Sequence, residues 1–92
     1  MSAEDQVSKR TILITGASSG IGRAVAELFL EKGWQVGLLA RRAEQLEEVA
    51  QDRDTAHVLP ADVTDPGAVD HAFDCFAKRV GRLDVLFNNA GI

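Results

Sequence analysis

The sequence predicts an α/β fold in which helices cover both faces of a parallel sheet, giving three layers. Short apolar runs with the length of buried strands alternate with segments whose apolar residues recur at helical spacing. Four such strands and three helices follow one another in the order β-α-β-α-β-α-β. Helices of this length between strands favour right-handed crossovers and therefore a parallel sheet. No linker or composition shift divides the 92 residues, so we expect a single small domain.

The first half of the chain contains two predicted strand–helix pairs. Residues 11–15 are β-branched or apolar and are followed by glycine, as is typical of a buried strand. The next segment carries apolar residues on one helical face as far as Gly33, which we expect to end the helix. Residues 34–40 form the second predicted strand, and a shorter, more polar helix spans about 43–50.

The second half predicts one more helix between two strands. Residues 57–60 form a short strand, after which Asp65 is placed to cap a helix with Pro66 at its first position. Gly81 is expected to end that helix, and residues 83–87 form the fourth strand. We expect the first two helices to cover one face of the sheet and the third to cover part of the other. The fourth strand should then be an open apolar edge.

Composition argues against several classes of partner. The net charge is −4, and no basic cluster is longer than Arg41-Arg42, so a cationic surface for nucleic acid or membranes is not expected. No apolar run approaches the roughly 18 residues that a membrane-spanning helix needs. The acidic, polar start of the chain does not resemble a secretory signal, and we expect residues 1–8 to be a flexible lead-in.

The cysteine and histidine residues predict neither a disulfide nor a metal site. Cys75 is the single cysteine, which forbids an internal disulfide and leaves a cytoplasmic location as the expectation. His57 and His71 lack the spacing of metal ligands, and we expect both to lie on the surface.

Three glycines follow the first predicted strand and open the first helix, which is the order that a phosphate-binding turn requires. Gly16 would allow a tight turn, and Gly20 and Gly22 would let the backbone approach a bound diphosphate and the sheet. Amide groups at the helix start, aided by the hydroxyls of Ser18 and Ser19, would bind the anion. The alternative is a plain turn that needs glycine for its backbone and binds nothing.

The end of the second strand carries information about the adenosine half of a dinucleotide. Many such sites place an acid there to accept hydrogen bonds from the ribose hydroxyls. Ala40 occupies that position, and Arg41 follows it. A guanidinium group pairs with phosphate through a planar fork of donors, so Arg41 is predicted to bind a 2′-phosphate, with Arg42 stacking on adenine or assisting. Alternatively, both arginines are solvated charges at the start of the next helix.

Three motifs together resemble the N-terminal half of the short-chain dehydrogenase/reductase superfamily. They are Thr15-Gly16-Ala17-Ser18-Ser19-Gly20-Ile21-Gly22, Asp62-Val63 and Asn88-Asn89-Ala90-Gly91, in the expected order. The resemblance covers residues 9–92 and implies a Rossmann-type fold. It also implies reversible hydride transfer between NAD(P) and an alcohol or carbonyl compound.

The resemblance assigns roles to individual residues. It implies that Asp62 accepts a hydrogen bond from the adenine amino group, that Val63 lies against the ring, and that Asn88 steadies the central strands. The alternative roles are a capping or turn aspartate for Asp62 and a turn asparagine for Asn89. The full set of expected cofactor-binding residues is Gly16, Ala17, Ser18, Ser19, Gly20, Ile21, Gly22, Arg41, Arg42, Asp62, Val63, Asn89, Ala90 and Gly91.

The catalytic groups that this family uses are not found in the sequence. Family chemistry needs a serine and a Tyr-x-x-x-Lys pair, whereas this chain contains no tyrosine. We therefore expect the cofactor-binding portion of an NADP-dependent oxidoreductase, with NAD the less favoured cofactor, and no activity from this chain alone. A substrate and a homodimeric or homotetrameric state are expected only of a full-length form. Two alternatives stay open: a non-catalytic nucleotide-binding fragment, and an interaction protein that pairs with a full-length relative.

Overall fold

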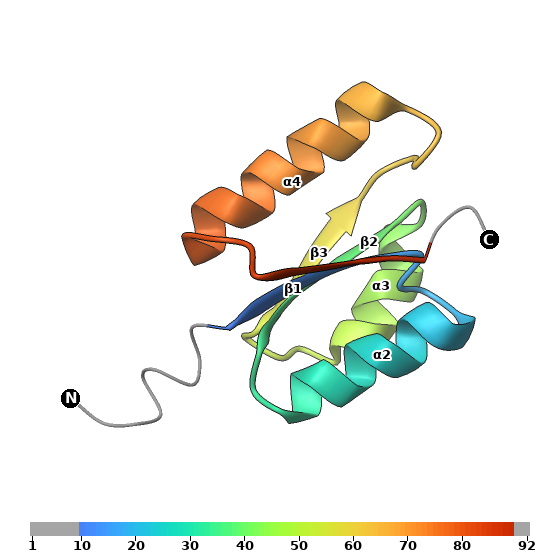
Figure 1. The fold of residues 1–92 in the computed structure, drawn as a ribbon. Coiled ribbons are helices and arrows are strands. Elements are labelled where there is room, and N and C mark those ends of the chain that lie inside the picture. Colours follow the sequence, from blue (N-terminus) through green and yellow to red (C-terminus); the bar gives the residue numbers. More distant parts are fainter. Residues whose placement is uncertain (1–9, 90–92) are drawn as a thin grey trace.

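The protein forms one parallel sheet covered by helices on both faces, as the sequence predicts (Figure 1). The computed structural model describes residues 10–89, so the predicted lead-in over residues 1–8 lies outside the described residues. The strand order is β3-β2-β1-β4, and all three neighbouring pairs are parallel. In chain order the elements are β1 (Thr11–Thr15), α2 (Gly20–Glu31), β2 (Gln35–Ala40), α3 (Ala43–Ala50), β3 (Ala56–Pro60), α4 (Pro66–Val80) and β4 (Val85–Asn88).

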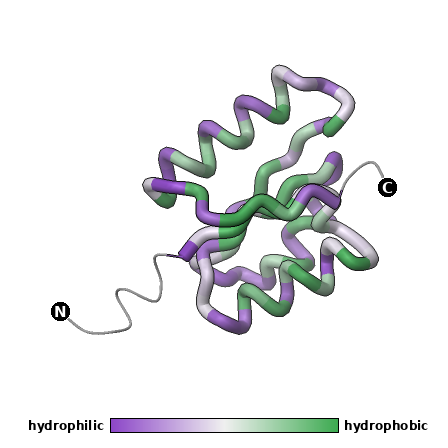
Figure 2. The backbone as a smooth tube through the Cα atoms, viewed as in Figure 1, coloured by the Kyte–Doolittle hydropathy of each residue, from purple (hydrophilic) through white to green (hydrophobic). Residues whose placement is uncertain are grey.

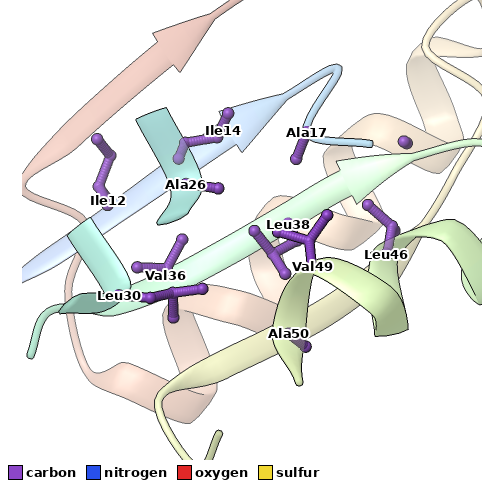
Figure 3. Packing of buried hydrophobic residues seen from close by; sticks show 11 residues of the cluster. Ile12, Ile14, Ala17, Ala26, Leu30, Val36, Leu38, Leu46, Val49 and Ala50 are labelled. Carbon is purple, nitrogen blue, oxygen red and sulfur yellow. The ribbon is translucent and has the colours of Figure 1, made fainter. Parts of the chain in front are cut away.

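Helices α2 and α3 cover one face of the sheet, and α4 covers the other (Figure 1). The larger core lies on the α2–α3 side, where side chains from β1 and β2 meet both helices (Figure 3). Apolar colouring is concentrated in the central strands (Figure 2). This core consists of Ile12, Ile14, Ala17, Ala26, Leu30, Val36, Leu38, Ala40, Leu46, Val49 and Ala50.

The second core lies under α4 and is smaller. Side chains alternate between the two faces of a strand, so Leu13 and Leu39 point away from the larger core and meet Phe76. Phe76 is fully buried and is the largest side chain that α4 contributes. The remaining buried members are Leu59 and Ala72. The predicted division of the helices between the two faces is therefore confirmed.

The predicted ends of the helices agree with the structure. Gly33 follows α2 with φ +84°, and its N–H donates to the Leu30 carbonyl at 3.1 Å. Gly81 ends α4 with φ +88°, and its N–H donates to the Ala77 carbonyl. The Asp65 carboxylate caps α4 by accepting from the N–H groups of its first turn. Both glycines adopt the left-handed conformation that commonly ends a helix.

Three strand starts differ from the sequence prediction, of which the third strand, at Ala56 instead of residue 57, differs by a single residue. The fourth strand begins at Val85 instead of residue 83, because the Asp84 N–H donates to the Thr11 hydroxyl at 2.8 Å instead of to a backbone carbonyl of β1. The second strand begins at Gln35, because the Trp34 N–H still donates to the Phe29 carbonyl of α2 at 3.1 Å. Trp34 then packs edge-to-face on the Phe29 ring, with centroids 4.6 Å apart.

Side chains tie the amino ends of β1 and β4 together. The Thr11 N–H donates to Oδ2 of Asp84 at 3.0 Å, and the Asp84 N–H donates to Oγ1 of Thr11 at 2.8 Å. The Arg82 guanidinium pairs with the other Asp84 oxygen. The Arg82 hydrogen bond, followed by that from Thr11, lowers the pKa of Asp84 below its usual range. These bonds fix the pairing of the first and last strands.

The outer side of β4 is an open apolar edge, as predicted. Val85 is 40% exposed and Leu86 is 45% exposed, although both belong to a strand of the sheet. Among the described residues, β4 pairs with β1 alone. An exposed strand edge with apolar side chains favours pairing with further polypeptide.

Gly22 sets the distance between α2 and the turn that follows β1. An ideal Cβ at this position would lie 2.1 Å from the Gly16 carbonyl oxygen and 2.8 Å from Nδ2 of Asn89. Real Cβ atoms do not approach backbone oxygens so closely. The first turn of α2 can therefore pack against the turn only because residue 22 has no side chain.

The prediction that His57 lies on the surface is wrong. The ring is half-buried under α4, where it meets the Phe76 ring edge-to-face at 5.3 Å, and its Nε2 is 2.7 Å from Oε1 of Gln35. Burial, and secondarily the positive charge of Arg79, lower the pKa of His57 from its ordinary 6.5. His71 is exposed on α4, as predicted.

We predict that Gly22→Ala lowers the free energy of unfolding by about 2–3 kcal/mol, because the new methyl group overlaps the Gly16 carbonyl. Chemical denaturation followed by circular dichroism measures the change. Gly67→Ala is the matched control, because a Cβ there would meet Asp65 Oδ1 at an ordinary 3.5 Å. The control should be neutral or slightly stabilising. Equal losses in the two variants would contradict the close-packing role of Gly22.

We predict that the protein loses stability as the pH falls below about 6.5. The unfolded chain binds a proton at His57 more readily than the folded chain does, so stability rises with pH between the lowered pKa and 6.5. Below the lowered pKa this contribution is fully lost. Denaturation midpoints between pH 7.5 and 5 should depend less on pH in His57→Gln than in wild type. His71→Gln, which removes an exposed histidine, should follow the wild-type curve. Parallel curves for wild type and His57→Gln would refute the assignment.

Candidate functional site

The carboxyl ends of all four strands lie at one edge of the sheet, on the right in Figure 1. The glycine turn follows β1, Arg41 follows β2, Asp62 follows shortly after β3, and Asn89 follows β4. The strand order reverses direction between β1 and β4, and open parallel sheets bind ligands at such a point. The fold thus brings the predicted site residues that the structure describes to one edge.

The glycine turn has the backbone conformation that its sequence predicts. Gly16 and Gly20 have φ values of +67° and +60°, which residues with side chains rarely adopt. Ala17 between them is fully buried, and its N–H donates to the Leu39 carbonyl of β2 at 3.2 Å. Nothing lies within 4 Å of an ideal Cβ at Gly20, so the space beside the start of α2 is open.

The amide groups at the start of α2 are not capped by the preceding side chain. Ser19 is the N-cap residue, yet its hydroxyl makes no capping hydrogen bond, and no acidic residue lies in the first turn. The start of α4 is different, because there Asp65 accepts from two amide groups. Free amides and the positive end of the helix dipole favour an anion at the start of α2.

Thr15, the last residue of β1, joins the glycine turn to the end of β4. Its hydroxyl donates to Oδ1 of Asn88 at 2.9 Å and accepts from the Asn89 N–H at 2.9 Å. The side-chain nitrogen of Asn89, Nδ2, in turn donates to the Gly16 carbonyl at 3.4 Å. Asn88 therefore links β1 to β4, in keeping with the structural role that the family resemblance implies. Asn89 lies beside the glycine turn, and Ala90 and Gly91 fall outside the described residues.

Arg41 and Asp62 meet across the ends of β2 and β3. Nη2 of Arg41 lies 3.6 Å from Oδ1 of Asp62, and their side chains are 72% and 43% exposed. The same oxygen accepts from the Thr64 N–H at 2.9 Å and from the Thr64 hydroxyl at 2.7 Å. These Thr64 bonds, more than the charge of Arg41, lower the pKa of Asp62 below its usual range.

The remaining predicted residues lie at the same edge with exposed or half-exposed side chains. Arg42 is exposed and is the N-cap residue of α3, so the two arginines follow β2 and open the next helix. Ile21 is 66% exposed and Val63 is 41% exposed. Ser18 is half-buried, and Ser19 is exposed.

A hollow of about 340 Å³ opens between the ends of β1 and β4 and the start of α4. Its walls are mostly apolar, with the Thr15 and Asn88 side chains at one end. The lining residues are Thr15, Val63, Thr64, Val69, Phe73, Leu86 and Asn88. The hollow therefore adjoins the point where the strand order reverses.

Two threonines of the site were not predicted from the sequence. Thr15 anchors both asparagines, and Thr64 fixes the Asp62 carboxylate. The Asp-x-Thr spacing of residues 62 and 64 is a recognisable signal for a side-chain turn. Thr15 gives no comparable signal, because its partners lie at the far end of the chain.

Residues 10–89 contain no group of three or more His, Cys, Asp or Glu side chains close enough to hold a metal ion. None of the helices in this range has the length and apolar character needed to cross a bilayer.

Comparisons with a family model and with individual proteins point to the same family. The family model for short chain dehydrogenase matches residues 10–92. An uncharacterized oxidoreductase of Mycobacterium tuberculosis is 44% identical over 94 residues, which cover 95% of this chain and 28% of that protein. The chain thus spans less than a third of the length of this relative.

Solved structures agree with the sequence comparison. The apo-form of glucose dehydrogenase from Caenorhabditis elegans matches with a TM-score of 0.85 and 36% identity, over 94% of this chain and 39% of that one. A 3-ketoacyl-(acyl-carrier-protein) reductase from Brucella melitensis, complexed with NADH, matches with a TM-score of 0.79 and 33% identity, over 84% of this chain and 32% of that one. With its Rossmann-type sheet and a family match over residues 10–92, the chain belongs to the short-chain dehydrogenase/reductase family of oxidoreductases.

Proposed function

We propose that this chain forms the adenosine- and diphosphate-binding part of an NADP-dependent short-chain oxidoreductase. The observation that carries the proposal is the meeting, at one sheet edge, of an uncapped helix start and an exposed arginine after β2. The cofactor would supply hydride to, or accept it from, an alcohol or carbonyl substrate. The chain's own residues would bind and orient the cofactor.

The diphosphate would lie against the glycine turn. The start of α2 offers amide donors without a side-chain cap, and the open space beside Gly20 leaves room for an approaching phosphate. Gly22 lets α2 pack close to the turn, and Asn89 supports the Gly16 carbonyl from the other side. The backbone would therefore be arranged before the ligand arrives.

Arg41 supports a preference for NADP over NAD. No carboxylate follows β2 directly, because Ala40 is followed by two arginines. The Arg41 side chain is 72% exposed, so its guanidinium group can reach a 2′-phosphate. Asp62 and Val63 would contact the adenine, and Arg42 would stack on the ring or assist Arg41. Ala90 and Gly91 would complete the ribose side of the site.

The remaining parts of the activity belong to a longer form of the protein. We propose that residues 9–92 act there as the first half of the Rossmann-type domain, with a small alcohol or carbonyl compound as substrate. A homodimer or homotetramer located in the cytoplasm is the proposed setting. Similar proteins are named for different substrates, such as serine, sulfoacetaldehyde and glucose, so they support the reaction class and not a particular substrate.

We predict that Arg41→Gln weakens NADPH binding about tenfold and changes NADH binding less than twofold. A hydrogen bond to a charged group contributes about 1.5–3 kcal/mol, and the exposed position favours the lower value. Titration calorimetry of the 92-residue chain measures both affinities. Lys78→Gln is the matched control, because it removes one positive charge from the last turn of α4. Equal affinity of the wild type for NADPH and NADH would reject the role of Arg41.

A further inference from the structure

The ion pair between Arg41 and Asp62 has a consequence for cofactor selectivity. The backbone brings Arg41 and Asp62 together. The Ala61 N–H donates to the Ala40 carbonyl at 2.9 Å, and this bond extends the pairing of β2 and β3 by one residue. Arg41 and Asp62 each follow directly after that last bond. Their juxtaposition is therefore fixed by strand register and not by a chance meeting of long side chains.

The two partners of the pair are held to different degrees. Asp62 Oδ1 accepts both the N–H and the hydroxyl of Thr64, so the carboxylate is restrained on its own loop. Arg41 is a long side chain that is 72% exposed, and its polar contact within residues 10–89 is the 3.6 Å ion pair with Asp62. The carboxylate is thus the fixed member, and the guanidinium is the member that can move.

We propose that Asp62 acts as a competing counterion for Arg41 and so lowers the preference of the site for an adenosine that carries a 2′-phosphate. The inference rests on the proposed function, in which Arg41 binds that phosphate. To do so, the guanidinium group must share or leave the Asp62 carboxylate. An adenosine without the 2′-phosphate does not contact Arg41, so it binds without disturbing the Arg41–Asp62 ion pair.

The effect should be modest, because exposed ion pairs contribute little and are screened by salt. Removing the charge of Asp62 while keeping its acceptor oxygen, as in Asp62→Asn, preserves the partner of Thr64. Asp62 is also the proposed partner of adenine, and any change in that contact affects both nucleotides alike. We therefore expect this variant to favour adenosine 2′,5′-bisphosphate over adenosine 5′-monophosphate about two- to fivefold more than wild type does at low salt.

The experiment is titration calorimetry of the 92-residue chain with these two nucleotides, at about 20 mM and about 500 mM salt. The selectivity is the dissociation constant for adenosine 5′-monophosphate divided by that for adenosine 2′,5′-bisphosphate, so that a higher ratio means a stronger preference for the 2′-phosphate. It should rise in Asp62→Asn at low salt, and the rise should shrink at high salt. Asp54→Asn removes an exposed carboxylate that precedes β3, at the opposite edge of the sheet, and should leave the ratio unchanged.

A double-mutant cycle tests whether Asp62 acts through Arg41. In the Arg41→Gln background, Asp62→Asn should leave the selectivity unchanged, because no guanidinium group remains to be released. An unchanged or lower ratio in Asp62→Asn alone would overturn the inference. So would an equal rise in the Arg41→Gln background, since it would indicate direct repulsion of the phosphate by the carboxylate. Failure of the wild type to bind either nucleotide would instead remove the proposed function itself.

Discussion

The burial of β1 between β2 and β4 is the constraint on which the rest of the structure depends. All five residues of Thr11–Thr15 are buried, and the strand pairs in parallel on both sides. Its two faces point into different cores, so α2 and α3 must pack on one side and α4 on the other. The same burial places the glycine turn at the middle of the sheet edge, where the strand order reverses.

The first turns of α2 and α4 differ in whether a side chain caps their amide groups. Asp65 satisfies the first amides of α4 and places a negative charge at the positive end of its dipole. The start of α2 has neither a capping hydrogen bond from Ser19 nor an acid in its first turn. The chain itself caps the start of α4, whereas the start of α2 is uncapped by a side chain and is where we propose that the diphosphate binds. This difference locates the site more sharply than the glycine pattern does.

The sequence was a good guide wherever local periodicity decides the structure. The continuous β-branched and apolar run in 11–15 and the helical stripe that includes Phe76 are local signals, and the Asp65 and Gly33 helix ends follow from local backbone chemistry. The start of β4 was misplaced because Asp84 reads as part of an apolar run, yet its carboxylate serves Thr11 at the other end of the chain.

Contacts between distant segments explain the other differences. His57 was misplaced because its burial is decided by the Phe76 ring of a helix that comes later in the chain. The Arg41–Asp62 pair depends on the register of β2 against β3, which no spacing in the sequence reveals. The glycine turn, Arg41, Asp62 and Asn89 could be named in advance, whereas Thr15, Thr64 and the bonds that they make could not.

The Thr15 hydroxyl bonds to partners that lie 73 and 74 residues further along the chain. On the ribosome, the glycine turn is therefore made well before its anchor. Contacts of such long range are slow to form, since the closure of a long loop must precede them. A nascent chain that has completed α2 and β2 still lacks this anchor. The proposed capacity to hold a nucleotide should arise only after translation has delivered the asparagines at the end of β4.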